Sequence, residues 1–347
     1  MGRVVAVVGA TGAVGQDLCR LLEARSFPCD DRLVAIASAR SVAAGAHVRF
    51  RGRDIAVRAL TEERVFDGVD LALFSAGASR SLEHAPRAVA AGATVVDNSS
   101  GWRMNAEVPL VVAEVNPQAL DALPRGIVAN PNCTTMIAML PLKALHDRFG
   151  LESMVVTSFQ AAGGAGQKGI DELEAQIEPL FARRDLLRRD GAEAAALVTH
   201  QVHHSTLAFN VTPLIGVETE SGYTDEELKL QNESRKILDL PDLAVAPTCV
   251  RVPVMVGHAV AVRACFTKRI DLDEAMAALQ AFPGLSVEPA PTPLEWAGRD
   301  DVAVGRIRPD LVDRNALNFF VVGDNLLKGA ALNAVQIGEL LVQRGSV

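Results

Sequence analysis

The sequence predicts an α/β protein in which a doubly wound parallel sheet is followed by a second, α+β domain. Its 347 residues exceed the length at which one hydrophobic core usually stops growing, which favours two domains over one. Hydrophobic residues make up 49% of the chain and aromatic ones only 4%, a composition typical of helices packed tightly on a sheet. Short apolar runs also alternate with helix-compatible segments along the first third of the chain.

The first element is predicted to be a strand, because residues 4–8 form a continuous apolar run that ends at Gly9. Apolar side chains then recur at helical spacing from Val14 to Leu22, so the order is strand, turn, helix. Four later apolar runs have the length of buried parallel strands and lie at residues 33–37, 71–74, 94–96 and 127–129. We therefore expect a first domain over residues 1–131.

After Asn130 the pattern changes to alternation, as in residues 250–254 and 260–262, which is typical of a sheet with one covered face. We expect a second domain over residues 132–324 and a C-terminal helix, residues 325–347, that returns to the first domain. Residues 182–205 are charged, then alanine-rich, then histidine-rich, and no element is predicted there because they lack a clean period.

Charge and cysteine content argue against several functional classes. A formal net charge of -8 without a long run of lysine or arginine argues against a nucleic-acid partner. No apolar stretch has membrane-spanning length, so no membrane association is expected. The five cysteines lack the paired spacing of a secreted disulfide framework, which favours the cytoplasm. His200, His203 and His204 have no obvious acidic or cysteine partner, and no metal is predicted.

Residues 9–15 have the glycine pattern G-x-x-G-x-x-G between the first strand and the first helix. Such a turn presents free amides and the positive end of the helix dipole to a pyrophosphate. The alternative is a tight turn that only permits close helix packing. We favour a Rossmann-type dinucleotide site, with contacts predicted at Gly9, Thr11, Gly12, Ala13 and Val14.

The end of the predicted second strand favours NADP over NAD as the dinucleotide. An NAD site usually has an acidic residue about 20 residues past the glycines, where it holds the ribose 2′-hydroxyl. Here the strand is followed instead by Ser38, Arg40 and Ser41. An arginine with flanking hydroxyls suits a 2′-phosphate, and the alternative is a solvated loop arginine.

Cys133 is the candidate nucleophile. Asn132 is a good helix N-cap and precedes the apolar stretch 136–142, which places Cys133 in the first helical turn. There the helix dipole and the free amides stabilise a thiolate. The remaining cysteines lack this setting and are expected to be buried structural residues; they are Cys19, Cys29, Cys249 and Cys265.

A second group of polar residues begins at Thr224. Thr224 and Glu227 have the spacing of a capping box, so a helix is predicted to begin there. Glu226 and Lys229 then share one face of that helix, where a solvated ion pair is the simplest interpretation.

Arg251 and His258 form a further candidate pair. Arg251 lies on the strand face opposite Val250, and His258 follows it after seven residues. This odd separation points the two side chains apart unless a turn or bulge near Gly257 intervenes. From the residues alone, a salt-bridged arginine and a structural histidine are the simpler interpretations.

Four segments in chain order together resemble aspartate-semialdehyde dehydrogenase. They are GATGAVG at residues 9–15, DNSSGWRM at 97–104, NPNCTT at 130–135 and DNLLKGAA at 324–331. The resemblance spans nearly the whole chain and is weakest over residues 182–205. The resemblance depends on the presence of all four motifs in this order, since no single motif is specific to the family.

The resemblance implies a covalent mechanism and assigns roles to residues of this chain. Cys133 forms a thioester with the aspartyl group, and His258 is the general acid and base. Gln160, which by itself would be an ordinary polar residue at a strand end, binds and orients the intermediate. Arg251 receives the substrate carboxylate and Glu226 its ammonium group.

Phosphate and cofactor contacts are also implied by the resemblance, as is a homodimer. The phosphate is assigned to Arg103, Lys229 and Asn132, and further cofactor contacts to Gly163, Gly164 and Asn325. The family commonly has Tyr and Ser where this chain has Phe159 and Gly163, so contacts on the nicotinamide side are expected to differ.

The implied reaction is the NADP-dependent reductive dephosphorylation of L-4-aspartyl phosphate to L-aspartate 4-semialdehyde, at the branch leading to lysine, threonine and methionine. Two alternatives stay open. N-acetyl-glutamyl-phosphate reductase shares the architecture and the thioester strategy, but its substrate has no free ammonium group for Glu226. A catalytically silent NADP-binding homologue would keep the glycines and lose the chemistry.

Overall fold

The computed structural model describes residues 2–347, except for the side chains of Asp30 and Asp31. The chain forms two compact units. The first contains the residues up to Met139 together with Arg235–Leu240 and Leu326–Val347, and the second contains Leu140–Ser234 and Pro241–Asn325. In the described residues, no helix is both long and apolar enough to cross a membrane.

The first unit contains the predicted parallel sheet, with strand order β5-β2-β1-β6-β7-β8. The strands are β1 (Arg3–Val8), β2 (Cys29–Ala37), β5 (Arg58–Ala59), β6 (Leu71–Phe74), β7 (Thr94–Asp97) and β8 (Ile127–Ala129). Each predicted apolar run lies in one of these strands, and β6 is buried along its whole length. Runs that are apolar on both faces suit a sheet covered on both sides, so the prediction of a doubly wound fold is confirmed.

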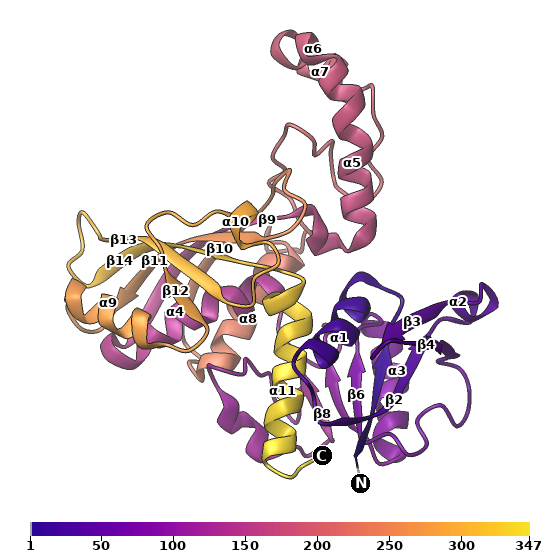
Figure 1. Ribbon diagram of the computed structural model, residues 1–347. Helices are drawn as coiled ribbons and strands as arrows, with labels where there is room; N and C mark the ends of the chain where they lie inside the picture. Colours follow the sequence, from indigo (N-terminus) through magenta and orange to yellow (C-terminus); the bar gives the residue numbers. More distant parts are fainter. Residues whose placement is uncertain (1) are drawn as a thin grey trace. The chain divides into compact units, whose positions relative to one another are not determined.

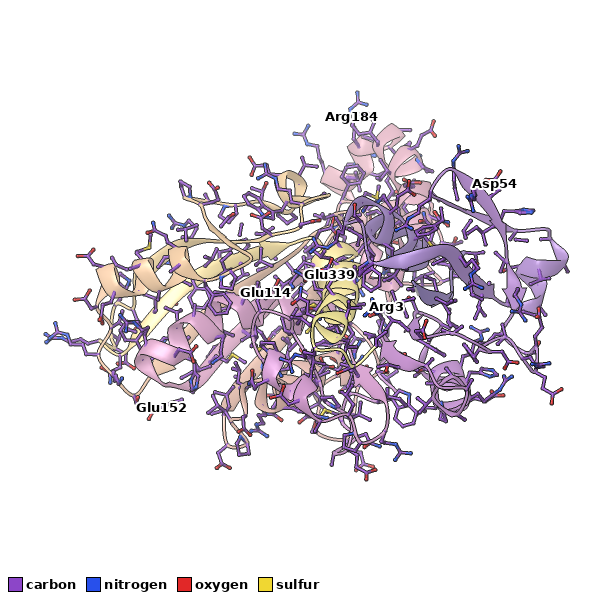
Figure 2. The ribbon with its side chains drawn as sticks, turned by 60° about the horizontal axis from the view of Figure 1, so that its bottom comes forward. Arg3, Asp54, Glu114, Glu152, Arg184 and Glu339 are labelled. Atoms are coloured by element: carbon purple, nitrogen blue, oxygen red, sulfur yellow. The ribbon has the colours of Figure 1, made fainter. Side chains whose placement is uncertain are left out.

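Helices of the first unit pack on this sheet and on one another. They are α1 (Ala13–Ala24), α2 (Ala39–Ala43), α3 (Ala78–Ala90), the 3₁₀ turn η1 (Pro117–Asp121), the π-helical turn η3 (Leu327–Ala331) and α11 (Leu332–Gln343). Helices α1 and α11 lie side by side, and Leu18 and Val335 join the same apolar cluster as alternate residues of β1 (Figure 1). Arg25, the C-cap residue of α1, forms an ion pair of 2.8 Å with Glu339 on α11, and Figure 2 labels Glu339. The hairpin of β3 (His47–Phe50) and β4 (Arg53–Ala56) completes the unit.

The second unit contains a mixed sheet with strand order β10-β9-β11-β14-β13-β12. Its strands are β9 (Leu151–Gln160), β10 (Ala244–Arg251), β11 (His258–Phe266), β12 (Leu285–Val287), β13 (Val302–Pro309) and β14 (Ala316–Gly323). Alternate residues of β9 are buried, whereas Val155 on the other face is 50% exposed, so the prediction of one covered face is confirmed. The strand expected over residues 250–254 ends at Arg251. The Val252 amide still donates to the Gln160 carbonyl, and the chain then turns, with the Val254 amide donating to the Val252 carbonyl.

Two helices are divided between the units: α4 (Cys133–Phe149) begins in the first unit and ends in the second, and α8 (Asp225–Leu238) begins in the second and ends in the first. The other helices of the second unit are the 3₁₀ turn η2 (Ala162–Ala165), α5 (Gln167–Ala182), α6 (Arg184–Arg189), α7 (Gly191–Ala195), α9 (Leu272–Ala281) and α10 (Pro293–Trp296). The predicted capping box is confirmed, since the Glu227 amide donates to Thr224 Oγ1 and the Thr224 amide donates to Glu227 Oε2.

Residues 182–205, for which no element was predicted, contain α6, α7 and an irregular segment. The irregular segment is held by Glu172 of α5, whose carboxylate accepts the backbone N–H groups of residues 201–203. The ring of His203 bonds to the Gly169 carbonyl and that of His204 to the Gly216 carbonyl. This segment is thus stabilised by side-chain acceptors, which leave no periodic signal in the sequence.

Candidate active site

The glycine turn of the first unit has the geometry of a phosphate-binding turn. Gly9 has φ +89°, and a Cβ there would lie 2.1 Å from the Ser75 carbonyl oxygen. A Cβ on Gly15 would lie 2.1 Å from the Gly9 carbonyl oxygen, so neither position admits a side chain. Helix α1 begins at Ala13, directly after Gly12, and its first amides face away from the helix body.

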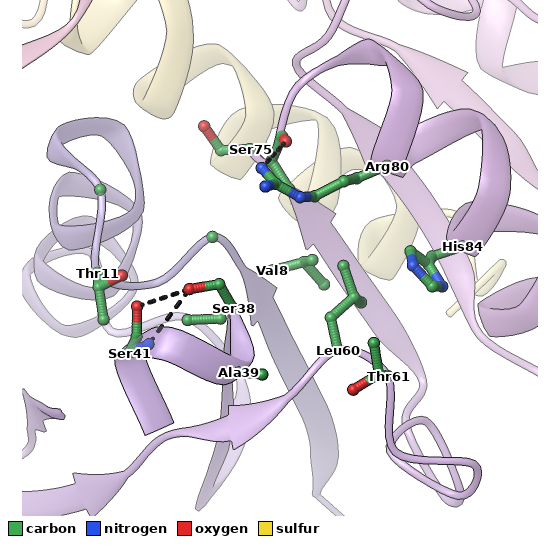
Figure 3. A pocket seen from close by; sticks show the side chains of 14 residues that line it. Val8, Thr11, Ser38, Ala39, Ser41, Leu60, Thr61, Ser75, Arg80 and His84 are labelled. Atoms are coloured by element: carbon green, nitrogen blue, oxygen red, sulfur yellow. Dashed lines mark hydrogen bonds between the residues drawn. The ribbon is translucent and has the colours of Figure 1, made fainter. Parts of the chain in front are cut away.

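A cavity of about 400 Å³ lies beside this turn. Figure 3 shows Ser38 and Ser41 on one side of the cavity and Arg80 and His84 on another. Ser38 caps α2, since its Oγ accepts the Ser41 amide at 3.2 Å. Among the predicted cofactor contacts, those that line the cavity are Gly9, Thr11, Gly12, Ser38 and Ser41.

Arg40, the predicted contact for a 2′-phosphate, is exposed on α2 and is not one of the residues that line this cavity. The arginine that does line it is Arg80 on α3, whose Nη1 donates to the Ala76 carbonyl at 3.2 Å. Sequence reasoning missed Arg80, because no local spacing relates the start of α3 to the end of β2. Of the other predicted contacts in this region, Ala13 begins α1 and Val14 packs against the apolar core.

Cys133 begins helix α4, as predicted. Asn132 Oδ1 accepts the amide of Thr134 at 2.9 Å and that of Thr135 at 3.3 Å, which confirms the N-cap. The Cys133 residue is half-buried. A thiol in this position lies at the positive end of the helix dipole, where a thiolate is favoured.

The remaining cysteines divide into two pairs. Cys19 and Cys249 are buried, and burial raises the pKa of each thiol to about 12. Cys29 and Cys265 are half-buried, so the expectation of burial was wrong for them. The reason for Cys265 is strand parity, because it shares the open face of β11 with Arg263, whose Nη1 approaches its Sγ at 2.8 Å. Cys29 is the first residue of β2, where the strand emerges from a turn.

Arg103 is buried and is held against the turn that carries Cys133. Its Nε donates to the Asn130 carbonyl and its Nη2 to the Asn98 carbonyl, each at 2.9 Å. The side chain of Asn98 was also missed by sequence reasoning, although its motif was noted. Both polar atoms of that side chain are buried and have no hydrogen-bond partner among residues 2–347. A buried amide left in this way costs about 1–3 kcal/mol, which a ligand can offset.

In the second unit, strand register brings three predicted site residues into one row. Arg251 of β10 pairs with Gln160 of β9, and Ala259 of β11 pairs with Phe159, which sets His258 opposite Gln160. The predicted turn between Arg251 and His258 is present, with Gly257 at φ +98°.

His258 and Arg251 meet at the backbone of Ala161. Arg251 Nη1 donates to the Ala161 carbonyl at 2.7 Å, and His258 Nδ1 accepts the Ala161 amide at 3.0 Å. His258 is completely buried, and this burial, together with the charge of Arg251, holds its pKa well below the usual value. The neutral ring therefore carries its proton on Nε2.

Gln160 connects this row to helix α8. It is 1% exposed, and its Nε2 donates to Glu226 Oε1 at 3.2 Å. Lys229 Nζ lies 3.1 Å from Glu226 Oε2 and 2.9 Å from Asp225 Oδ2. Burial opposes the charged form of Lys229, but the two carboxylates outweigh it and raise its pKa.

Gly163, in η2, and Asn325, which follows β14, both bond to the turn before β11. Asn325 Oδ1 accepts the Gly257 amide at 2.8 Å, and the Gly163 amide donates to the Met255 carbonyl at 2.9 Å. A Cβ on Gly163 would lie 2.8 Å from that carbonyl oxygen, so in this chain the position has no room for serine. Phe159, the other departure from the family pattern, packs against Phe320 on the sheet face opposite Gln160.

Comparisons with known proteins give a consistent family. Residues 4–123 match the semialdehyde dehydrogenase NAD binding domain, and residues 142–328 match the semialdehyde dehydrogenase dimerisation domain. The chain is 50% identical over 345 residues to aspartate-semialdehyde dehydrogenase of Corynebacterium glutamicum, covering 98% of this chain and 99% of that one. It is 44% identical over 354 residues to the enzyme of that name from Aquifex aeolicus, covering both chains completely.

Solved structures show the same likeness. Aspartate semialdehyde dehydrogenase II of Vibrio cholerae, complexed with ASA, superposes with a TM-score of 0.92 at 41% identity and covers 99% of each chain. The enzyme from Candida albicans, solved with NADP, has a TM-score of 0.75 at 24% identity over 99% of this chain and 100% of that one, a likeness of fold.

Proposed function

Because the chain belongs to the aspartate-semialdehyde dehydrogenase family, we propose that it reduces L-4-aspartyl phosphate to L-aspartate 4-semialdehyde with NADP and a thioester on Cys133. The observation that carries this proposal is the turn before α4. There Asn132 caps the helix that begins at Cys133, and Arg103 is hydrogen-bonded to the same turn through Asn130. The product would serve lysine, threonine and methionine synthesis.

The residues around the glycine turn support a dinucleotide as cofactor. Gly9 and Gly15 let the turn pack directly against the Ser75 carbonyl and against itself, and Gly9, Thr11 and Gly12 line the adjacent cavity, which is of the right order for an adenosine group. Arg40 and Arg80 are the nearby candidates for a 2′-phosphate, as NADP requires. The cofactor supplies the hydride when it is bound. We propose that the buried amide of Asn98 also receives a group of the cofactor or substrate.

Cys133 is the nucleophile of the proposed reaction. Its thiolate forms a C–S bond to the acyl carbon while the bond between that carbon and the phosphate oxygen breaks. Arg103, Lys229 and Asn132 receive the departing phosphate. His258 donates a hydrogen bond from Nε2 to the substrate oxygen as charge develops on it. After reduction the C–S bond breaks, which releases the aldehyde and restores the thiolate.

Charge in the second unit supports recognition of an amino acid. Asp225, Glu226 and Lys229 form one cluster with a formal charge of one negative unit, which a substrate ammonium group would neutralise. Arg251 offers a planar guanidinium to the substrate carboxylate. Gln160 lies between the two and would orient the bound intermediate.

We further propose that the two units act as a dinucleotide-binding domain and a catalytic and dimerisation domain, and that the chain forms a homodimer. The match to a dimerisation domain supports this, as does the uncovered face of the second sheet, where Val155, Ala261 and Phe320 line a shallow hollow of about 290 Å³. Analytical ultracentrifugation of the chain would test the dimer. The cytoplasm stays a prediction from the cysteine pattern.

The proposed activity is tested in the reverse direction, with aspartate semialdehyde, phosphate and NADP, by following NADPH formation. Stoichiometric NADPH in a single turnover supports the proposal. N-acetyl-glutamate semialdehyde is the comparison substrate, and preference for it would indicate N-acetyl-glutamyl-phosphate reductase instead. NADP binding without turnover of either substrate would instead indicate a silent homologue.

A further inference from the structure

Asn333, in the first turn of α11, is completely buried and uses its amide group fully. Its Nδ2 donates to Asn130 Oδ1 at 2.6 Å and to the Val111 carbonyl at 2.9 Å. Its Oδ1 accepts from the Ala113 amide at 3.0 Å and from Lys328 Nζ at 3.3 Å. A buried amide with four partners fixes the positions of those partners relative to one another.

Asn130 is where this network meets the turn that carries the nucleophile. The Asn130 amide donates to the Asp97 carbonyl at 2.8 Å, and the Asn130 carbonyl accepts from Arg103 Nε at 2.9 Å. Its side-chain Nδ2 donates to the Ala330 carbonyl at 3.1 Å. Asn130 precedes Cys133, the first residue of α4, by three residues, and Asn132 between them caps the helix.

The other side of Asn333 is anchored by a buried charged cluster. Lys328 is 1% exposed and forms an ion pair with Glu114, which lies beside α11 (Figure 2). Gln336 joins the pair, accepting from Lys328 Nζ at 2.7 Å and donating to Glu114 Oε1 at 2.8 Å. Lys328 reaches this cluster from the π-helical turn η3, and π-helical turns are frequent at functional sites. A satisfied buried cluster of this kind gives a rigid support.

We propose that Asn333 is a positioning residue for Cys133. By holding Asn130, it fixes both the N-terminus of α4 and the carbonyl to which Arg103 is bound. The inference rests on the proposed function, in which Cys133 is the nucleophile and Arg103 binds phosphate. Asn333 itself touches no substrate and acts through the turn.

The chain offers a closely matched control in Asn116. Like Asn333, it is a buried asparagine that holds the segment 110–113, donating to the Leu110 carbonyl and accepting the Val112 amide, each at 2.9 Å. Unlike Asn333, it has no hydrogen bond to Asn130. Asn333→Asp and Asn116→Asp each keep an acceptor oxygen, lose the donor group and add a carboxylate. They differ in that only the first removes the bond to Asn130, and in that the added carboxylate lies beside Lys328 at Asn333.

The test measures iodoacetamide alkylation of Cys133 against pH by peptide mass spectrometry, together with kcat, the KM for phosphate and the Kd for NADP. For Asn333→Asp we expect slower alkylation with its midpoint moved to higher pH, and a kcat lowered on the order of tenfold to a hundredfold. The Kd for NADP should stay within about twofold of the wild-type value, because the glycine turn is untouched. Asn116→Asp should leave the alkylation profile unchanged.

A wild-type profile and kcat in Asn333→Asp would overturn the inference, as would an equal change in both variants. If Asn333→Asp does not fold, Asn333→Ser removes the bond to Asn130 without adding a charge, and the same shift is expected. Failure of the proposed function has a different signature. In that case Cys133→Ala keeps its turnover, whereas the alkylation profile still reports whether Asn333 positions the turn.

Discussion

Gly164→Ala should separate catalysis from stability in this protein. A Cβ at Gly164 would lie 2.6 Å from Arg251 Nη1 and 3.1 Å from His258 Cε1, where ordinary contact begins at 3.4 Å. Gly164 is exposed and its φ is not positive, so alanine is compatible with the backbone. The guanidinium, at the end of a flexible side chain, must therefore move by about 0.8 Å while the fold is kept.

A displacement of this size at a substrate-orienting group costs about a hundredfold in rate, or about 2.7 kcal/mol in the activation barrier. Steady-state kinetics with aspartate semialdehyde should show a lower kcat and a higher KM. The thermal midpoint should move by only a few degrees, as expected for about 1 kcal/mol. Gly191→Ala is the control, because a Cβ there meets nothing within 4 Å, and its kinetics should match the wild type. A Gly164→Ala enzyme with wild-type kcat and KM would refute the assignment of Arg251 and His258 to the substrate.

Three further substitutions test individual assignments. Cys133→Ala should abolish turnover while NADP affinity stays nearly intact, and residual turnover near wild type would exclude the thioester; Cys19→Ala should be almost silent. Arg40→Asp should lower kcat/KM with NADP relative to kcat/KM with NAD. If that ratio does not change, Arg80 remains the candidate for binding the 2′-phosphate of NADP. Arg251→Lys keeps the charge but loses the planar fork, so aspartate semialdehyde use should fall strongly with little change in NADP binding. If Arg251→Lys raised only the KM for phosphate, Arg251 would have to be assigned to the phosphate, and the substrate carboxylate to Arg103 and Lys229.

Elements with a local signal were predictable from the sequence. The apolar runs of the parallel strands, the cap at Asn132 and the box at Thr224 each depend on residues within a few positions of one another. Segment 182–205 gave no such signal, because the carboxylate of Glu172 and the amide of Gln176, both on α5, hold its irregular part. The strand expected past Arg251 was too long, because the alternation of apolar residues continues into the turn that follows β10 and so does not mark the end of the strand.

Contacts between distant parts of the chain were beyond the reach of spacing. Parity along one strand placed Arg251 and His258 apart, and only the pairing of both neighbouring strands with β9 shows that they share a row with Gln160. The residues of α2 and α3 that line the cofactor cavity are likewise far apart in the sequence, and only the order of the strands in the sheet brings them together.

The bond between Asn333 and Asn130 joins residues 203 positions apart, and although Asn130 opens the motif at residues 130–135, nothing near it in the sequence indicates a partner on the C-terminal helix. The family resemblance drew attention to the motif at residues 324–331, but that motif ends before Asn333. A buried amide is costly unless each of its groups is paired, so its presence in the apolar interface of α11 calls for partners of matching geometry. Here those partners belong to the segment before η1, to the turn before α4 and to η3. The C-terminal helix thus contributes to the nucleophile's geometry as well as to the core of the first unit.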